Sequence, residues 1–265
     1  MSEQLIARID HGVGSIVLNR PEALNAFTAE MAAELPEIVD RMERDPAVRA
    51  VLIRGEGRSF TAGGDVKGFH AALIADRAAH AAGMEKRIVT GHLTMHRIRR
   101  MPKPVLVAFQ GITAGLGVSL VACADLAMAA DDAELMLAYR HVGLSVDGGV
   151  SHFLPRIVGE RRAMQITLLG ERIDAATALD WGLANWVVPV EELTERATNL
   201  ARDLAQGPTV ALAASKRLLR DSLQRGWDEQ SAAEACALSL VAASDDHFEG
   251  VSAFVEKRSA RYEGR

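Results

Sequence analysis

Short runs of apolar and β-branched residues alternate along the chain with longer stretches in which apolar residues recur every three or four positions. The short runs predict strands, because β-branched side chains pack well on a pleated sheet. The longer stretches predict helices, since this spacing places the apolar side chains on one face. The predicted strands cover residues 5–9, 15–18, 48–53, 105–109, 126–129 and 135–137. The alternation of the two patterns predicts an α/β fold.

The first long helix is predicted around Met31, Leu35 and Ile38, with Thr28 capping its N-terminus. Residues 66–101 have weak apolar periodicity, which by itself indicates a solvated connector. After Gly159 the strand pattern fades, and helices are predicted over residues 174–180, 191–206, 209–223, 228–243 and 247–259. We therefore divide the chain into a core over residues 1–200 and a C-terminal helical region over residues 201–265.

The composition, 49% hydrophobic and 25% charged, is typical of a folded soluble protein. A formal net charge of −5 offers no basic surface for nucleic acid. Gln110, Asp125 and several glycines interrupt the most apolar stretch, so a buried strand and helix explain it better than a membrane span. The N-terminus does not resemble a signal peptide, and Cys123 and Cys236 have no metal-ligand spacing. We expect a cytoplasmic protein with reduced, buried thiols and no metal.

Two glycine-rich turns follow predicted strands, one at residues 62–65 and one at residues 111–117. Glycine lets the chain turn tightly and lets another group approach the main chain. The second turn leads into a helix, whose N-terminus favours negative charge. Backbone N–H groups in such turns can stabilise an oxyanion.

In this order, the two turns resemble those of the crotonase superfamily, the enoyl-CoA hydratases and isomerases. Residues 18–26 are similar to the family's first CoA-contacting segment, and residues 252–258 to its C-terminal signature. The resemblance implies the crotonase (ClpP/crotonase) fold, in which a ββα spiral core precedes a C-terminal helical region used for trimerisation and active-site closure. It also implies a homotrimer or a dimer of trimers, and a partly mobile helix and loop at residues 66–101 over the acyl pocket.

The resemblance further implies where an acyl-CoA would bind. The backbone N–H groups of Gly64 and Leu116 would hold the thioester oxygen. Coenzyme A would enter as part of the substrate, with no cofactor bound permanently. The CoA-contacting residues implied by position are Arg20, Leu24, Ala62, Asp65 and Lys67, together with Phe254 and Lys257 from a neighbouring subunit.

Hydratases of this family use two glutamates, and the chain has Ser119 and Tyr139 at those positions. A hydroxyl at neutral pH neither accepts nor releases a proton readily, so the usual hydration mechanism is missing. Asp147 remains, and its position resembles that of the catalytic acid in 2,4-dienoyl-CoA isomerases and in the ring-expanding isomerase of phenylacetate breakdown. The resemblance therefore favours an enoyl-CoA isomerase in which Asp147 is the single acid and base and Tyr139 orients it.

Four other hypotheses stay open. Asp147 alone could activate water for hydration at low efficiency. In 4-chlorobenzoyl-CoA dehalogenase the Asp at this position is a nucleophile, and His92, or His96, matches the spacing of the histidine that activates water there. Ser119 follows Gly and Val as in half of a nucleophile elbow, which indicates a serine hydrolase. A non-catalytic CoA-binding protein would bind the ester without turnover.

Overall fold

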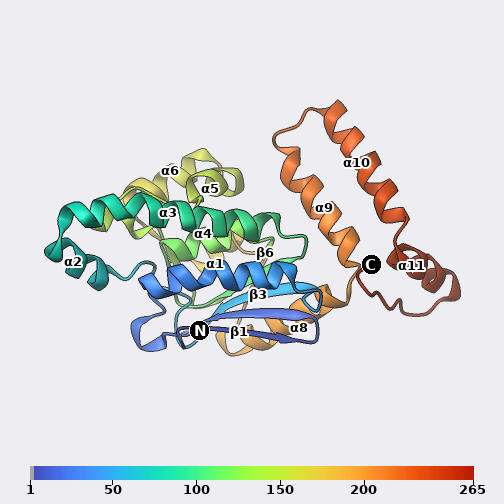
Figure 1. Ribbon diagram of the computed structural model, residues 1–265, viewed down its shortest axis with the longest axis horizontal. Helices are drawn as coiled ribbons and strands as arrows, with labels where there is room; N and C mark the ends of the chain where they lie inside the picture. Colours follow the sequence, from blue (N-terminus) through green and yellow to red (C-terminus); the bar gives the residue numbers. More distant parts are fainter. Residues whose placement is uncertain (1–2) are drawn as a thin grey trace.

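The computed structural model describes residues 3–265 and contains two sheets, helices on both faces of the larger one, and a C-terminal group of helices that projects away (Figure 1). The larger sheet has the strand order β1-β2-β3-β4-β6-β9. Only the β1–β2 hairpin is antiparallel in it, and the other neighbours are parallel. Its strands are β1 (Leu5–Asp10), β2 (Val13–Leu18), β3 (Ala50–Gly55), β4 (Val105–Phe109), β6 (Leu126–Ala130) and β9 (Trp186–Val188).

The smaller sheet lies beside the second glycine turn. It consists of β5 (Ile112–Ala114), β7 (Glu134–Met136) and β8 (Arg172–Asp174). Strands β8 and β9 both follow Gly159, so the prediction that only helices lie there is wrong. Each of these strands has three residues, which is too few to show a two-residue alternation. They form because distant strands, β7 and β6, offer them hydrogen-bonding partners.

The two faces of the larger sheet are covered by α1 (Ala29–Arg44) and α8 (Leu193–Gln206), which lie on opposite sides of it in Figure 1. Successive residues of β3 pack alternately on the α1 side and on the α8 side of the sheet, because successive side chains of a strand point to opposite faces. The Thr28 side chain accepts a hydrogen bond of 3.2 Å from Met31 N, so the predicted N-cap of α1 is confirmed.

Residues 66–101 form two helices, α2 (Val66–Ala75) and α3 (Arg77–Arg100), and the interpretation as a solvated connector is wrong. Only the last part of α3 packs on the core, through Thr94, Met95 and Ile98. The apolar periodicity is weak because the rest of α3 has no core beneath it.

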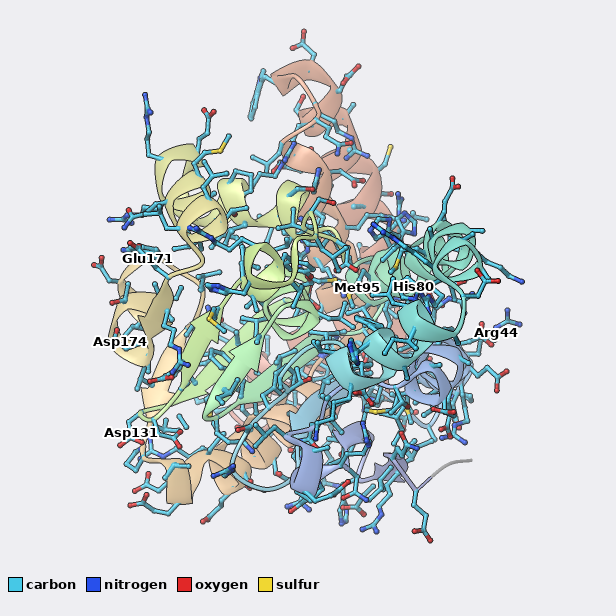
Figure 2. All side chains as sticks on the ribbon, turned by 90° about the vertical axis from the view of Figure 1, so that its left-hand side faces the viewer. Arg44, His80, Met95, Asp131, Glu171 and Asp174 are labelled. Atoms are coloured by element: carbon cyan, nitrogen blue, oxygen red, sulfur yellow. The ribbon has the colours of Figure 1, made fainter. Side chains whose placement is uncertain are left out.

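The remaining helices of the core are short and connect the ends of the strands. They are η1 (Pro21–Ala23), α4 (Leu116–Cys123), η2 (Ala138–Val142), α5 (Val150–Val158), α6 (Glu160–Leu169), α7 (Ala175–Asp180) and η3 (Val190–Glu192). Figure 2 shows Asp131, Glu171 and Asp174 on the outside of this region, where all three are exposed. No helix within residues 3–265 is both long enough and apolar enough to cross a bilayer.

The C-terminal region consists of α9 (Thr209–Ser222), α10 (Trp227–Ala242) and α11 (Asp245–Glu256), which extend from the core in Figure 1. A division at residue 200 falls inside α8, where Ala201 and Ala205 still pack on the sheet, so a boundary after Gln206 follows the packing better. Large apolar side chains are exposed on these helices, namely Leu219, Leu223, Trp227, Leu238, Leu240, Phe248 and Phe254. Apolar exposure of this kind marks a surface that packs against a partner.

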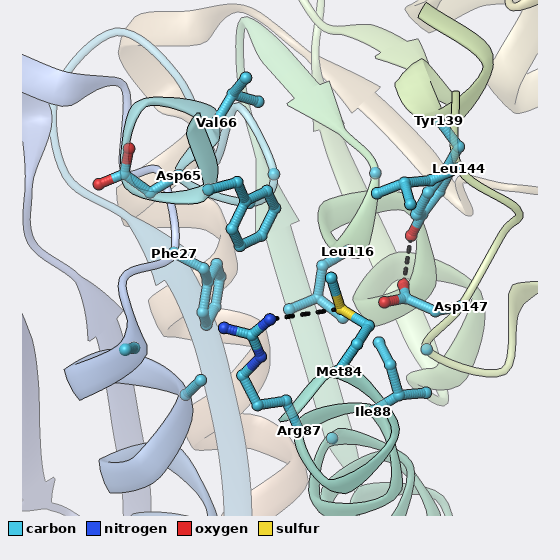
Figure 3. Close-up of a pocket in the computed structure, with 18 of the residues that line it drawn as sticks. Phe27, Asp65, Val66, Met84, Arg87, Ile88, Leu116, Tyr139, Leu144 and Asp147 are labelled. Carbon is cyan, nitrogen blue, oxygen red and sulfur yellow. Dashed lines mark hydrogen bonds between the residues drawn. The ribbon is translucent and has the colours of Figure 1, made fainter. Parts of the chain in front are cut away.

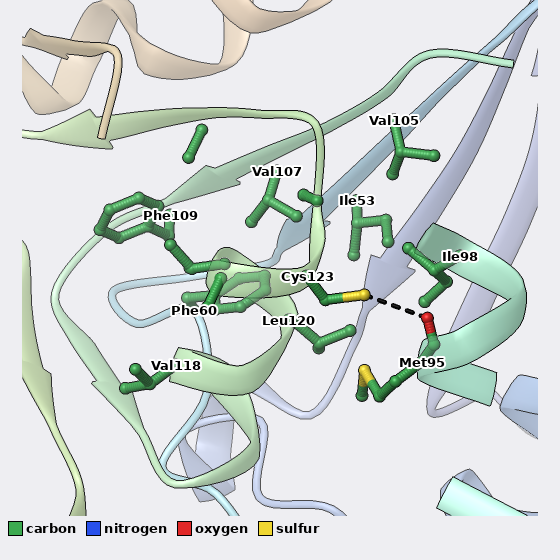
Figure 4. Packing of buried hydrophobic residues seen from close by; sticks show 14 of the residues in the cluster. Ile53, Phe60, Met95, Ile98, Val105, Val107, Phe109, Val118, Leu120 and Cys123 are labelled. Carbon is green, nitrogen blue, oxygen red and sulfur yellow. Dashed lines mark hydrogen bonds between the residues drawn. The ribbon is translucent and has the colours of Figure 1, made fainter. Parts of the chain in front are cut away.

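The two cysteines differ in their surroundings. Cys123 is fully buried among apolar side chains of the core, and its Sγ donates a hydrogen bond of 3.1 Å to Met95 O (Figure 4). Burial raises the pKa of the Cys123 thiol to about 12, which keeps it protonated and unreactive. Cys236 on α10 is exposed, so the prediction of two buried thiols is wrong for this residue.

Candidate active site

A cavity of about 610 Å³ lies between the two glycine turns and the helices α1, α2 and α3. Figure 3 shows three groups of side chains around it. One wall contains Phe27, Asp65 and Val66, the opposite wall contains Tyr139, Leu144 and Asp147, and α3 contributes Met84, Arg87 and Ile88.

Backbone hydrogen bonds join the two glycine turns. Thr61 N donates to Ile112 O at 3.1 Å, and Ala114 N donates to Thr61 O at 2.8 Å. Gly63 and Gly115 have φ angles of +88° and +54°, which L side chains rarely adopt. A Cβ atom on Gly63 would also lie 3.1 Å from the carbonyl oxygen of Ala114. Glycine at these positions therefore lets the turns pack against each other at the cavity.

Two backbone N–H groups at the cavity lack an acceptor. Phe27 N bonds to Gly63 O at 2.7 Å and Asp65 N to Phe27 O at 3.0 Å, and Gly64 between them donates to nothing within residues 3–265. Leu116 is the first residue of α4, so its N–H has no carbonyl of a preceding turn, nor any other acceptor in the described chain. Both residues line the cavity, and unpaired N–H groups of this kind can bind a ligand oxygen.

Tyr139 and Asp147 come from different segments and meet at the cavity. The Tyr139 hydroxyl donates a hydrogen bond of 2.5 Å to Asp147 Oδ1, drawn as a dashed line in Figure 3. Burial, and then the nearby Asp147 carboxylate, raise the pKa of Tyr139 well above its usual range, so it remains a proton donor. Asp147 Oδ2 has no donor among residues 3–265. This oxygen is therefore the one that can act on a ligand.

The residues expected to contact CoA divide into two sets. Ala62 and Asp65 line the cavity, and Ala62 N is held by Leu24 O at 2.8 Å. Arg20 lies 3.8 Å from Asp65, whose side chain also caps α2. Lys67 is exposed on the first turn of α2. These five residues, Arg20, Leu24, Ala62, Asp65 and Lys67, form one region of a single chain.

Phe254 and Lys257 are not brought to this region. Phe254 is 85% exposed near the end of α11, and Lys257 is the exposed C-cap residue of the same helix. Figure 1 shows α11 in the projecting C-terminal region, apart from the cavity near α2 and α3. Their expected contact with CoA therefore depends on a neighbouring subunit.

The other candidate side chains are separated by the fold. His92 is exposed on α3 and lines the cavity, whereas the exposed His96 is not part of its lining. Ser119 is 0% exposed, and its hydroxyl donates to the carbonyl oxygen of Asp147 at 3.2 Å. A nucleophilic serine must face a substrate and a base, so this arrangement weakens the serine hydrolase hypothesis.

Several wall residues were missed from the sequence. The Arg87 guanidinium lies 5.9 Å from the centre of the Phe69 ring, and its Nη2 lies 3.6 Å from Met84 Sδ. A helical spacing of four residues between Met84 and Ile88 was the available signal. Within residues 3–265, no group of three or more His, Cys, Asp or Glu side chains could hold a metal ion.

Comparison with known proteins gives a consistent result over nearly the whole chain. The model of the enoyl-CoA hydratase/isomerase family matches residues 8–265. The chain is 37% identical to 1,2-epoxyphenylacetyl-CoA isomerase of Escherichia coli (strain K12), over 100% of both sequences. It is 35% identical to a probable enoyl-CoA hydratase of Rhodobacter capsulatus, over 97% of this chain and 96% of that one.

A solved structure supports the same relationship. The putative enoyl-CoA hydratase/isomerase from Mycobacterium abscessus superimposes with a TM-score of 0.94 at 34% identity, covering 98% of this chain and 100% of the other. The crotonase fold implied by the two glycine turns is thereby confirmed.

Proposed function

The chain belongs to the enoyl-CoA hydratase/isomerase family, and we propose that it is an enoyl-CoA isomerase that moves a double bond with Asp147 as the single proton carrier. One observation carries this proposal. The free Oδ2 of Asp147 lines the same cavity as the two unpaired N–H groups of Gly64 and Leu116. A base beside a pair of oxyanion donors is what proton abstraction next to a thioester requires.

The reaction proceeds in two proton transfers. Asp147 Oδ2 takes a proton from C2 of a 3-enoyl-CoA, and the negative charge moves onto the thioester oxygen. The N–H groups of Gly64 and Leu116 donate hydrogen bonds to that oxygen, and each donor lowers the barrier by about 3 kcal/mol. The same carboxyl group then returns the proton to C4, which gives the 2-enoyl-CoA and restores the enzyme.

Tyr139 keeps one oxygen of the acid out of the reaction. Its hydroxyl bonds to Oδ1, and its raised pKa means that it donates throughout the physiological range. The carboxylate therefore presents Oδ2 in a fixed orientation, which favours removal and return of the proton by one atom. The Asp65 carboxylate pairs with Arg20 and caps the N-terminus of α2, so it is poorly suited to act as a second acid.

The CoA part of the substrate is proposed to bind along Arg20, Leu24, Ala62, Asp65 and Lys67. The exposed apolar side chains of α9, α10 and α11 support a homotrimer or a dimer of trimers. In such an assembly Phe254 and Lys257 would reach the CoA of a neighbouring subunit. The core, residues 1–200, would then bind the acyl-CoA. The C-terminal helical region, residues 201–265, would form the oligomer and close the active site.

A dehalogenase is a second candidate because His92 lines the cavity that contains Asp147. In that reaction Asp147 would attack the ring carbon, chloride would leave, and water activated by His92 would release the product. The isomerase among the relatives, which is 37% identical over the whole chain, favours isomerisation. Hydration by Asp147 alone is the third candidate, and the hydratase among the relatives supports testing it.

The test is a turnover panel with 3-enoyl-CoA, 2-enoyl-CoA and 4-chlorobenzoyl-CoA. We expect the wild type to isomerise the first substrate, and Asp147→Asn to lose about 10³-fold in kcat because the amide cannot carry the proton. Binding of the CoA ester to Asp147→Asn, followed by calorimetry, serves as the control for folding and is expected to persist.

The other outcomes would contradict this mechanism or identify a different function. Full isomerase activity in Asp147→Asn would rule out the mechanism. Chloride release that is lost in His92→Gln would identify the dehalogenase. Ester binding without turnover of any of the three substrates, in the wild type, would identify a CoA-binding protein.

A further inference from the structure

Ser119 lies beneath the segment that carries the proposed acid. It is on α4, one helical turn after Leu116, and is 0% exposed. Its hydroxyl donates a hydrogen bond of 3.2 Å to the main-chain carbonyl oxygen of Asp147. A hydroxyl buried this deeply acts on its protein neighbours and has no access to a substrate.

Gly148 lets the Asp147 segment lie directly on α4. Its φ angle is +61°, and a Cβ atom there would lie 2.6 Å from Ser119 Oγ and 3.0 Å from Leu116 Cδ1. No side chain therefore separates this turn from the first turn of the helix. Asp147 and Leu116 are connected through a short, rigid path of packed atoms.

Ser119 also acts on Tyr139. Burial is the largest influence on the pKa of Tyr139 and raises it, while the neighbouring Ser119 side chain has a smaller effect in the opposite direction. The Ser119 hydroxyl therefore lies close to both partners of the Tyr139–Asp147 hydrogen bond. Tyr139 of η2 holds the carboxylate of Asp147, and Ser119 of α4 holds its main chain.

We propose that Ser119 is a positioning residue that sets the distance between the proton carrier Asp147 and the oxyanion donor Leu116. The inference rests on the proposed function, since proton transfer beside a thioester needs both groups in register. The first turn of α4 carries the Leu116 N–H and, through Ser119, holds the Asp147 main chain. A displacement of about 1 Å between reacting groups is enough to slow a reaction by about 10²-fold.

Cys123 provides a matched control for this role. It lies one turn further along α4, is also fully buried, and donates from its side chain to the carbonyl oxygen of Met95 at 3.1 Å. Ser119→Ala and Cys123→Ala therefore each remove one buried donor to a main-chain carbonyl from the same helix. Only the first donor bonds to the segment that carries Asp147; the second bonds to Met95 of α3, which lines the cavity but carries no group used in the proposed reaction.

The experiment compares both variants with the wild type on 3-enoyl-CoA that carries deuterium at C2. We expect Ser119→Ala to lower kcat about tenfold with KM unchanged, because positioning acts on the transition state. We also expect it to return less deuterium to C4, since a looser carboxyl group exchanges its deuteron with solvent. Cys123→Ala should keep the kcat and the label transfer of the wild type while losing a comparable amount of thermal stability.

Equal effects of the two variants on kcat and label transfer would overturn the positioning role and leave a purely structural one. Wild-type kcat and label transfer in Ser119→Ala would overturn it as well. Neither outcome affects the proposed isomerisation, which fails only if the wild type does not convert 3-enoyl-CoA or if Asp147→Asn still does. The two ideas are thus tested separately.

Discussion

Two cavities of the described chain, of about 610 Å³ and about 670 Å³, differ in how their polar groups are used. The first, at the glycine turns, contains two backbone N–H groups without acceptors, and a carboxylate oxygen without a donor, in the part of the chain that the structure describes. The second lies between the core and helices α9 and α10. Its lining includes seven cationic side chains, Arg49, Arg99, Arg100, Lys103, Lys216, Arg217 and Arg220.

Four of these seven cations donate to acceptors within the protein. Lys103 Nζ donates to Met42 O and Asp45 O at 2.8 and 2.7 Å. Lys216 and Arg220 share Asp125, each at 2.7 Å, which attaches α9 to the core. Burial, and then Arg220, lower the pKa of Arg99 to about 10, so it remains charged at neutral pH.

Volume therefore does not distinguish a ligand site from a structural cleft. The two cavities differ in the groups they leave unpaired: the first has two backbone N–H groups and a carboxylate oxygen without partners among residues 3–265, whereas four of the seven cations of the second are already held by protein acceptors. An unpaired group gains most from a ligand. Three experiments test this difference between the two cavities and the helices around them.

The largest effect is expected from Leu116→Pro. Proline removes the N–H of residue 116 but is tolerated at the first position of a helix, so α4 should still form. Loss of one oxyanion donor should lower kcat about 10²–10³-fold. Leu116→Ala keeps the N–H and is the control, with kcat expected near that of the wild type. Similar activity in both variants would show that this N–H does not contact the substrate.

Asp125→Asn should affect the second cavity in a different way. The Asp125 side chain is 16% exposed, and losing its charge leaves Lys216 and Arg220 without a counter-ion. We expect the free energy of unfolding in urea to fall by about 3 kcal/mol, with kcat of the folded protein little changed. Asp221→Asn breaks the more exposed pair with Arg225 and should cost less than about 1 kcal/mol. A large loss of kcat with unchanged stability would contradict the structural role of this cleft.

The smallest effect concerns the two thiols. At pH 8 a thiol reagent should label Cys236 rapidly and leave Cys123 unmodified, because burial raises the pKa of Cys123 to about 12 and blocks access. Mass spectrometry of the native protein should find one label, and urea-unfolded protein should show two. Rapid labelling of Cys123 in the native state would mean that α4 opens readily.

The sequence predicted the regular parts of this molecule well. The apolar spacing around Met31 and Leu35 gave α1, and the β-branched runs gave the long strands. It failed for β8 and β9, which have three residues each and depend on pairing with β7 and β6. It also failed for α3, where the helix is real but only its end packs on the core. The spacing of apolar residues along the chain reflects burial, so a helix or strand that buries few side chains shows only a weak periodic pattern.

A candidate site could be predicted from the sequence because its chemistry depends on residue types that are read directly. Glycines at 63 and 115 identified the turns, and Ser119 and Tyr139 in place of the family's glutamates pointed to Asp147. The sequence could not tell whether Tyr139 reaches Asp147, since the two are eight residues apart in irregular chain. The helical spacing of Met84 and Ile88 was a weak signal for one wall of the cavity, but nothing in the sequence indicated that Arg87 would line it.

The sequence by itself therefore determined most of the strands and helices and the two glycine turns, and it predicted Asp147 as the acid. Only the tertiary structure decided that the N–H groups of Gly64 and Leu116 have no acceptor within residues 3–265, that Ser119 bonds to the main chain of Asp147, and that α11, which carries Phe254, lies apart from the cavity. The physical reason is that propensity and turn formation are local, whereas an unpaired donor or a shared hydrogen bond depends on which distant segments pack together.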